Sequence, residues 1–146
     1  MLQYRLKDSP ALSMNLIVIV EDEPAIQQML MDLAEWWGCR TEVFGTADEA
    51  ARYLRGGVEQ PSLVITDHAM PGILSGFDLV VEAHERWPSL PIIMISAYAY
   101  EVTLPEVRHI VLLDKPWTIA SLSELAESLM RNGEAERQRM DQGSSG

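Results

Sequence analysis

The sequence contains a single cysteine, Cys39, in 146 residues, and an internal disulfide is therefore excluded. No other Cys and no His lies near it at the spacing of a metal site, which also argues against a thiolate zinc centre. We interpret Cys39 as a small buried apolar residue. Such cysteine usage is typical of a reducing compartment, and we expect a cytoplasmic protein.

Positive charge is also scarce, with 11 basic residues against 22 acidic ones and a net charge of -11. This charge repels the phosphates of nucleic acids and of anionic lipids, so we expect no direct binding to nucleic acid. Long apolar runs are missing too, because the longest, at residues 16–20, is too short to cross a bilayer. Membrane insertion is therefore not expected.

The chain does contain an alternation of two hydrophobic patterns. Short runs rich in β-branched residues predict strands, and apolar residues at three- and four-residue spacing predict helices between them. Thr46 is the expected cap of one helix, in a capping box with Glu49, and Thr118 or Ser121 that of the last. We predict strands at 16–20, 40–44, 63–66, 92–96 and 110–113, and helices at 24–37, 47–55, 77–87 and from 118 onward.

Strands alternating with helices predict a doubly wound α/β fold, in which a five-stranded parallel sheet carries helices on both faces. Pro105 and nearby β-branched residues make a poor helix, so the helix between the last two strands should be short or irregular. We expect a polar leader at 1–15 and one domain at 16–132. The charged residues 133–146, which end in Gly-Ser-Ser-Gly, are expected to form a flexible tail.

Reactive side chains stand at the carboxyl ends of the predicted strands, where sites of open parallel sheets lie. Clustered carboxylates repel one another, and Mg²⁺, which prefers oxygen ligands, removes that penalty. An aspartate can also attack phosphorus, and a lysine and a hydroxyl can then stabilise the transferred group. The side chains concerned are Glu21, Asp22, Asp67, Ser96 and Lys115.

The order and approximate spacing of these residues resemble the receiver domains of response regulators in bacterial two-component systems. The likeness covers residues 16–130 and includes Asp67 with Met70-Pro71-Gly72, Ser96-Ala97 and Lys115-Pro116. It is nearest to stand-alone receivers or those of hybrid histidine kinases. The resemblance implies a flavodoxin-like sheet with strand order 2-1-3-4-5.

The resemblance also implies a Mg²⁺ site. Asp22 and Asp67 would be direct ligands, Glu21 would act through water, and the backbone carbonyl of Ala69 would complete the protein ligands. Considered alone, Asp22 has a simpler interpretation, because aspartate is a common cap before a helix.

By the same resemblance Asp67 is the phosphoacceptor, Lys115 pairs with the phosphoryl oxygens, and Ser96 donates a hydrogen bond to one of them. The phosphoryl donor would be a phosphohistidine of a histidine kinase or phosphotransfer protein. The chain would then be a switch that changes binding to an unidentified downstream protein, and an enzyme only in its own phosphorylation and dephosphorylation. Homodimer formation is left open.

Some positions depart from the family pattern. Leu112 replaces the usual aromatic residue three positions before Lys115, so the common coupling between hydroxyl and ring is in question. The loop between Pro71 and Gly76 has one extra residue, and Trp117 replaces the commoner Phe. Tyr98 and Ala69 should influence how fast the acyl phosphate hydrolyses, in a direction that the sequence leaves open.

Two other functions compete with the switch. A receiver-like scaffold that works without phosphate would explain Leu112 and the weak helix before it. A phosphatase of the haloacid dehalogenase type also uses a nucleophilic Asp, but Ala69 stands where that family needs a second one. We assign no functional role to the three histidines, His68, His84 and His109.

Overall fold

The computed structural model describes residues 15–57, 59–97 and 103–144 and contains one five-stranded parallel sheet. The strand order is β2-β1-β3-β4-β5, which confirms the predicted fold. The strands are β1 (Leu16–Val20), β2 (Arg40–Phe44), β3 (Leu63–Asp67), β4 (Ile92–Ser96) and β5 (Ile110–Asp114). The helices are α1 (Pro24–Trp36), α2 (Ala47–Arg55), α3 (Gly76–Arg86) and α4 (Ile119–Ser144).

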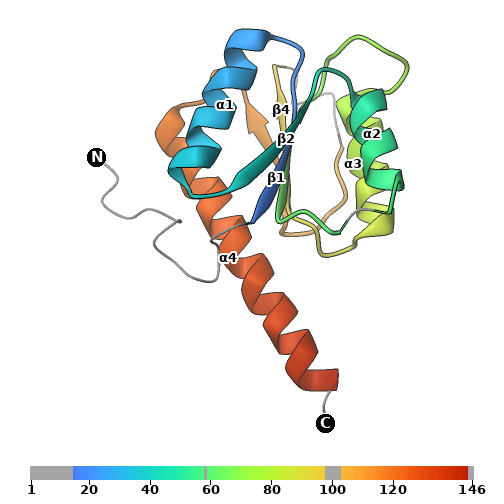
Figure 1. The fold of residues 1–146 in the computed structure, drawn as a ribbon, viewed down its shortest axis with the longest axis vertical. Helices are drawn as coiled ribbons and strands as arrows, with labels where there is room; N and C mark the ends of the chain where they lie inside the picture. Colours follow the sequence, from blue (N-terminus) through green and yellow to red (C-terminus); the bar gives the residue numbers. More distant parts are fainter. Residues whose placement is uncertain (1–14, 58, 98–102, 145–146) are drawn as a thin grey trace.

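Helices cover both faces of the sheet, with α1 and α4 on one face and α2 and α3 on the other (Figure 1). Successive side chains of a strand point to opposite faces, so Ile17 and Ile19 of β1 join the core under α1 and α4. Val18 and Val20 join the core under α2 and α3. Burial on both faces explains why β1 is apolar throughout.

Helix caps fix where several helices begin. The Thr46 side chain accepts a hydrogen bond from the Glu49 amide at 3.1 Å, as predicted, but the described contacts of α2 do not include the reciprocal bond of a capping box. A complete box is found at α3 instead, where Ser75 and Asp78 cap each other's amides. Because of this cap, α3 begins at Gly76, one residue earlier than predicted.

The segment between β4 and β5 contains no helix at residues 103–109, the part of it that the structure describes beyond Ala97. The Val107 amide instead donates to the Pro105 carbonyl in a tight turn. This agrees with the prediction of a short or irregular element there. Tyr98 lies outside the described residues.

The C-terminal end differs from the sequence-based prediction. Residues from 133 onward were expected to form a flexible tail, yet α4 continues as helix to Ser144 and extends away from the sheet (Figure 1). A Cβ at Gly133 would lie 3.2 Å from Pro91, so the helix still contacts the domain body there. Beyond that point Arg139 pairs with Glu136 at 2.8 Å, a local contact that supports a helix without burial.

Strands β3 and β5 each end one residue later than predicted, at Asp67 and Asp114 respectively. The described part of the chain has no helix that is both long enough and apolar enough to cross a membrane.

Candidate functional site

Three carboxylates meet at the carboxyl edge of the sheet. Glu21 and Asp22 directly follow β1, and Asp67 is the last residue of the neighbouring β3. One oxygen of each lies within 4.8 Å of the others. Glu21 and Asp67 are buried and Asp22 is exposed, so the cluster opens toward solvent on one side.

Burial and like charges raise the pKa of Glu21 from 4.5 to about 7, with burial as the main cause and the carboxylates of Asp67 and Asp22 adding to it. The Glu23 amide, which donates to Glu21 Oε1 at 3.1 Å, and the Lys115 ammonium oppose this shift. Without a cation the cluster therefore tends to hold a proton on Glu21. An oxygen-rich cluster of this kind fits a hard divalent cation such as Mg²⁺.

Asp67 is held by contacts to both its side chain and its backbone. The His68 amide donates to Asp67 Oδ1 at 2.9 Å, and the Lys115 ammonium lies 3.3 Å from the same oxygen. Gly76 packs so closely that a Cβ there would lie 2.1 Å from the Asp67 carbonyl oxygen, which excludes any larger residue. Both of these side-chain contacts involve Oδ1, so Oδ2 is the oxygen that could serve as a nucleophile.

Ser96 and Lys115 reach the same edge from the next two strands. Ser96 ends β4 and is buried, and its carbonyl accepts a hydrogen bond from the Lys115 amide at 3.1 Å. A cis peptide bond joins Lys115 to Pro116. The structure thus brings the predicted hydroxyl and ammonium groups to the edge that carries the carboxylates.

His68 is a site residue to which the sequence analysis gave no role. Its Nδ1 lies 3.5 Å from Ser96 Oγ, while its amide contacts Asp67. The ring therefore stands between the residues that end β3 and β4. The one feature of the sequence that could have indicated a site role for His68 is its position directly after Asp67. His84 and His109 contact each other, with ring centroids 5.8 Å apart, and His109 precedes β5 at the opposite edge of the sheet.

The loop of residues 68–75 follows Asp67 directly and returns close to it, because the Gly76 amide donates to the His68 carbonyl at 2.9 Å. Asp48 of α2 anchors its middle by accepting from the Ile73 amide at 3.1 Å and from the Leu74 amide. Gly72 adopts a φ of 113°, and a Cβ there would lie 2.3 Å from Asp48 Oδ2. The extra residue in this loop is thus accommodated by an anchored turn.

Three other predicted positions are less central. Ala69 is exposed in the loop, and the described contacts do not define a partner for its carbonyl. Leu112 is half-buried against the core under α2 and α3, and Trp117 packs against the core under α1 and α4. A cavity of about 560 Å³ lies beside the site and is lined by Glu21, Lys115, Pro116 and Trp117 among others.

Comparisons with known proteins agree with this geometry. The sequence profile of the response regulator receiver domain matches residues 17–127. The chain is 29% identical over 123 residues to the uncharacterized transcriptional regulatory protein YesN of Bacillus subtilis, covering 79% of this chain and 33% of YesN. It is 37% identical over 84 residues to the hydrogenase transcriptional regulatory protein HoxA of Cupriavidus necator, covering 56% of this chain and 16% of HoxA. It therefore spans a third or less of these relatives.

Solved receiver structures superpose over most of the chain. The response regulator TrrA of Thermotoga maritima, solved in complex with Mg²⁺ and BeF, has a TM-score of 0.68 at 26% identity, covering 80% of this chain and 99% of TrrA. The receiver domain of the hybrid histidine kinase CckA has a TM-score of 0.66 at 26% identity, covering 79% of this chain and 98% of the CckA domain. A receiver domain from Clostridium thermocellum has a TM-score of 0.73 at 24% identity, covering 84% of this chain and 98% of that domain. At this identity the likeness supports the fold alone.

Proposed function

The chain belongs to the response regulator receiver family, and on that premise we propose that it accepts a phosphoryl group on Asp67 in a Mg²⁺-dependent reaction. One observation carries the proposal: buried Asp67 has the Lys115 ammonium 3.3 Å from one oxygen and lies in a cluster of three carboxylates. A nucleophile, a positive charge and a cation site are then side by side, as phosphoryl transfer requires.

The proposed metal ligands are the carboxylates of Asp22 and Asp67, with Glu21 acting through a water molecule and the carbonyl of Ala69 completing the protein ligands. The oxygen-only donor set and the raised pKa of Glu21 both support a cation in this position. When bound, Mg²⁺ supplies positive charge for the oxygens of the transferred group. TrrA, a relative with the same fold, was solved with Mg²⁺ and BeF, which makes this ion a reasonable choice.

The proposed donor is a phosphohistidine of a histidine kinase or a histidine phosphotransfer protein. An Asp67 oxygen attacks phosphorus, the bond between phosphorus and the imidazole nitrogen breaks, and that nitrogen takes up a proton. The product is an acyl phosphate on Asp67. Lys115 would then pair with a phosphoryl oxygen and Ser96 would donate a hydrogen bond to another, roles that their positions at the ends of β5 and β4 support.

The output of the switch is proposed to be altered binding to a downstream protein in the cytoplasm. YesN and HoxA are described as transcriptional regulators, but this chain matches only a third or less of them, and its own acidic surface does not suit direct DNA binding. Leu112 cannot act as the swinging ring of other receivers. The change in binding would therefore have to spread through the loops that surround Asp67.

Labelling with acetyl phosphate tests this function without any partner protein. We expect Mg²⁺-dependent addition of one phosphoryl group, detected by mass spectrometry, and its loss in Asp67→Asn or when Mg²⁺ is chelated. Asp114→Asn is a matched control, because Asp114 ends β5 but is exposed and does not belong to the described carboxylate cluster. If folded wild-type protein takes no label, the phosphate-independent scaffold is the better description.

A further inference from the structure

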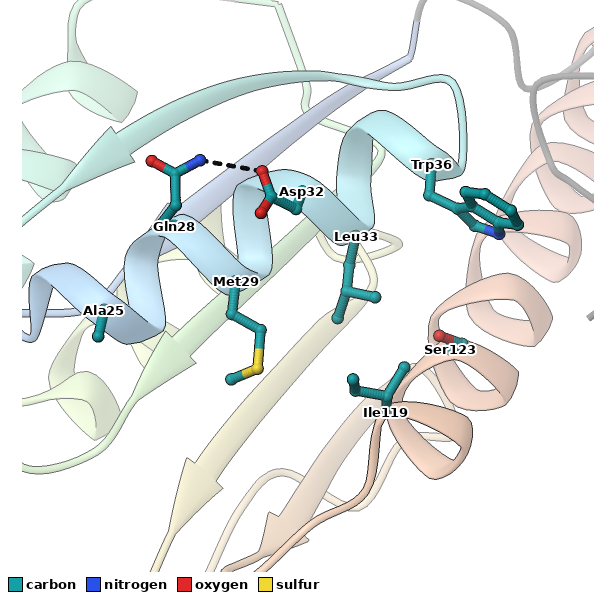
Figure 2. Close-up of a pocket in the computed structure, with 8 residues that line it drawn as sticks. All are labelled: Ala25, Gln28, Met29, Asp32, Leu33, Trp36, Ile119 and Ser123. Carbon is teal, nitrogen blue, oxygen red and sulfur yellow. Dashed lines mark hydrogen bonds between the residues drawn. The ribbon is translucent and has the colours of Figure 1, made fainter. Parts of the chain in front are cut away.

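A groove runs between α1 and the first turns of α4, on the face of the domain next to the phosphorylation site. It has a volume of about 570 Å³. Met29 and Leu33 of α1 point toward Ile119 of α4 across it, and Trp36 stands at one end (Figure 2). Ile119 is 52% exposed and Trp36 is 37% exposed. An apolar groove of this kind is stabilised when a second apolar surface covers it.

Ser123 limits what an occupant of the groove can contact. It lines the groove but is only 2% exposed, and its hydroxyl oxygen is buried without a hydrogen-bond partner among the described residues. An occupant would therefore contact the apolar side chains of the groove and not this hydroxyl.

The chain itself contains a suitable sequence outside the described residues. Residues 2–7 read Leu-Gln-Tyr-Arg-Leu-Lys, in which apolar and polar residues alternate. In an extended conformation this alternation places the three apolar side chains on one face. Residues 1–14 carry two basic residues against one acidic residue, in a chain whose net charge is -11. Asp32, which lines the groove and accepts a hydrogen bond from Gln28, offers a negative charge there.

The connection to the domain makes this contact reachable. The Asn15 carbonyl accepts a hydrogen bond from the Arg40 amide at 2.7 Å, and Arg40 follows soon after Trp36, where both α1 and the groove end. The α1 side of the groove, from Ala25 to Trp36, is about 17 Å long at 1.5 Å per residue. Six extended residues span about 20 Å, so residues 2–7 would cover it. Residues 8–14 remain to connect them to Asn15.

We propose that residues 2–7 bind in extended form along the groove between α1 and α4. Their apolar face would pack against Met29 and Ile119, and the basic side chains would lie near Asp32. Met29 and Ile119 also line the cavity that contains Lys115, so the bound segment would reach the rim of the phosphorylation site. The contact itself does not depend on phosphorylation.

A nitroxide spin label tests this contact in the intact chain. Gln3→Cys places the label on the polar side of the segment, and Cys39→Ala in the same protein removes the only native thiol. We expect the methyl signals of Met29, Leu33 and Ile119 to lose more than half of their intensity. Methyls of Leu79, in the core under α2 and α3, should keep theirs. Equal intensities at both sets would overturn the proposal.

Two further samples identify the occupant and its binding groups. Replacing both Leu2 and Leu6 by Ser in the labelled chain should restore the Ile119 signal at least twofold. A mixture of isotope-labelled protein without the nitroxide and unlabelled protein carrying it should show no broadening. Broadening in that mixture would mean that the segment binds a second copy, and would overturn the intrachain form of the proposal.

Discussion

The Lys115 ammonium lies 3.3 Å from Asp67 Oδ1, although β4 lies between β3, which ends at Asp67, and β5, which Lys115 follows. The Asp67 side chain is 7% exposed, whereas that of Lys115 is 42% exposed. The pair therefore joins a fixed buried carboxylate to a long cation that can still move. Such a cation can follow negative charge from the carboxylate to an incoming phosphoryl oxygen.

Removal of the Lys115 charge should slow phosphorylation more than it weakens Mg²⁺ binding. In Lys115→Ala we expect the rate of labelling by acetyl phosphate to fall about 10- to 100-fold, because one group that stabilises the transferred phosphoryl charge is lost. Quantitative mass spectrometry over time gives the rate. Arg55→Ala is the control, because Arg55 is an exposed cation on α2 that pairs with Glu82 on α3 and not with the carboxylates of the site. Equal rates in the two variants would contradict the role of Lys115.

Magnesium should stabilise the protein more at neutral pH than at acidic pH. The pKa of Glu21 in the folded, metal-free protein is raised from 4.5 to about 7, so the folded state holds this proton more tightly than the unfolded state does. The resulting stabilisation is complete below about pH 4.5 and is lost as the pH rises through about 7. Mg²⁺ favours the ionised carboxylate, so its effect on Tm should grow over the same range.

Thermal unfolding with and without saturating Mg²⁺ at several pH values measures this effect. Glu21→Gln removes the titrating group and should flatten the pH dependence of the metal-free protein. Glu49→Gln, which alters an exposed carboxylate on α2, should leave the dependence unchanged. An increase in Tm that is independent of pH in the wild type would show that Glu21 does not respond to the ion.

The fold and the edge that carries the site were predictable because both follow from short-range patterns. The β-branched run at 16–20 identifies a strand buried on both faces, and parallel strands necessarily bring Glu21, Asp67 and Lys115 to one edge. The cap at Thr46 was equally readable, because a capping hydroxyl and its amide lie only three residues apart. The roles of these residues in chemistry remain predictions.

Other features depend on contacts that the sequence does not reveal. Asp48 and Ile73 lie on α2 and on a loop after β3, and no local pattern joins them. The continuation of α4 was missed because residues 133–144 were assessed by how little apolar surface they could bury, whereas charge pairs along the helix support it. His68 was given no role because the sequence has three scattered histidines and does not indicate which of them faces Ser96.

Asp48 should stabilise the loop that surrounds the phosphoacceptor candidate. Asp48→Ala removes the acceptor of the Ile73 and Leu74 amides, and we expect a loss of about 1–2 kcal/mol in the free energy of unfolding. Urea unfolding measures this loss. Asp48→Asn keeps one carbonyl acceptor and should lose less, and Glu49→Ala serves as an exposed neighbour control. Faster amide hydrogen exchange at residues 73 and 74 should accompany the loss.

Cys39 should react very slowly with thiol reagents while the protein is folded. Burial raises the pKa of its thiol from 9.0 to about 11, and the folded state therefore favours the neutral thiol. At pH 8 the thiolate fraction would be about 100-fold lower than for a free thiol, because each pKa unit changes it tenfold. Labelling by iodoacetamide, followed by mass spectrometry, should be at least 100-fold slower than in the urea-unfolded chain.

The pH dependence of this reaction separates the raised pKa from simple steric protection. If the pKa is raised, the labelling rate of folded protein should keep increasing tenfold per pH unit between about pH 8 and pH 10, whereas the labelling rate of the unfolded chain should level off near pH 9.

The same shift means that the stabilisation from the neutral thiol is complete below about pH 9 and is lost as the pH rises through about 11. Cys39→Ala should remove that alkaline loss of stability. A folded-state labelling rate that levels off near pH 9 would show that Cys39 ionises as it does in an unfolded chain.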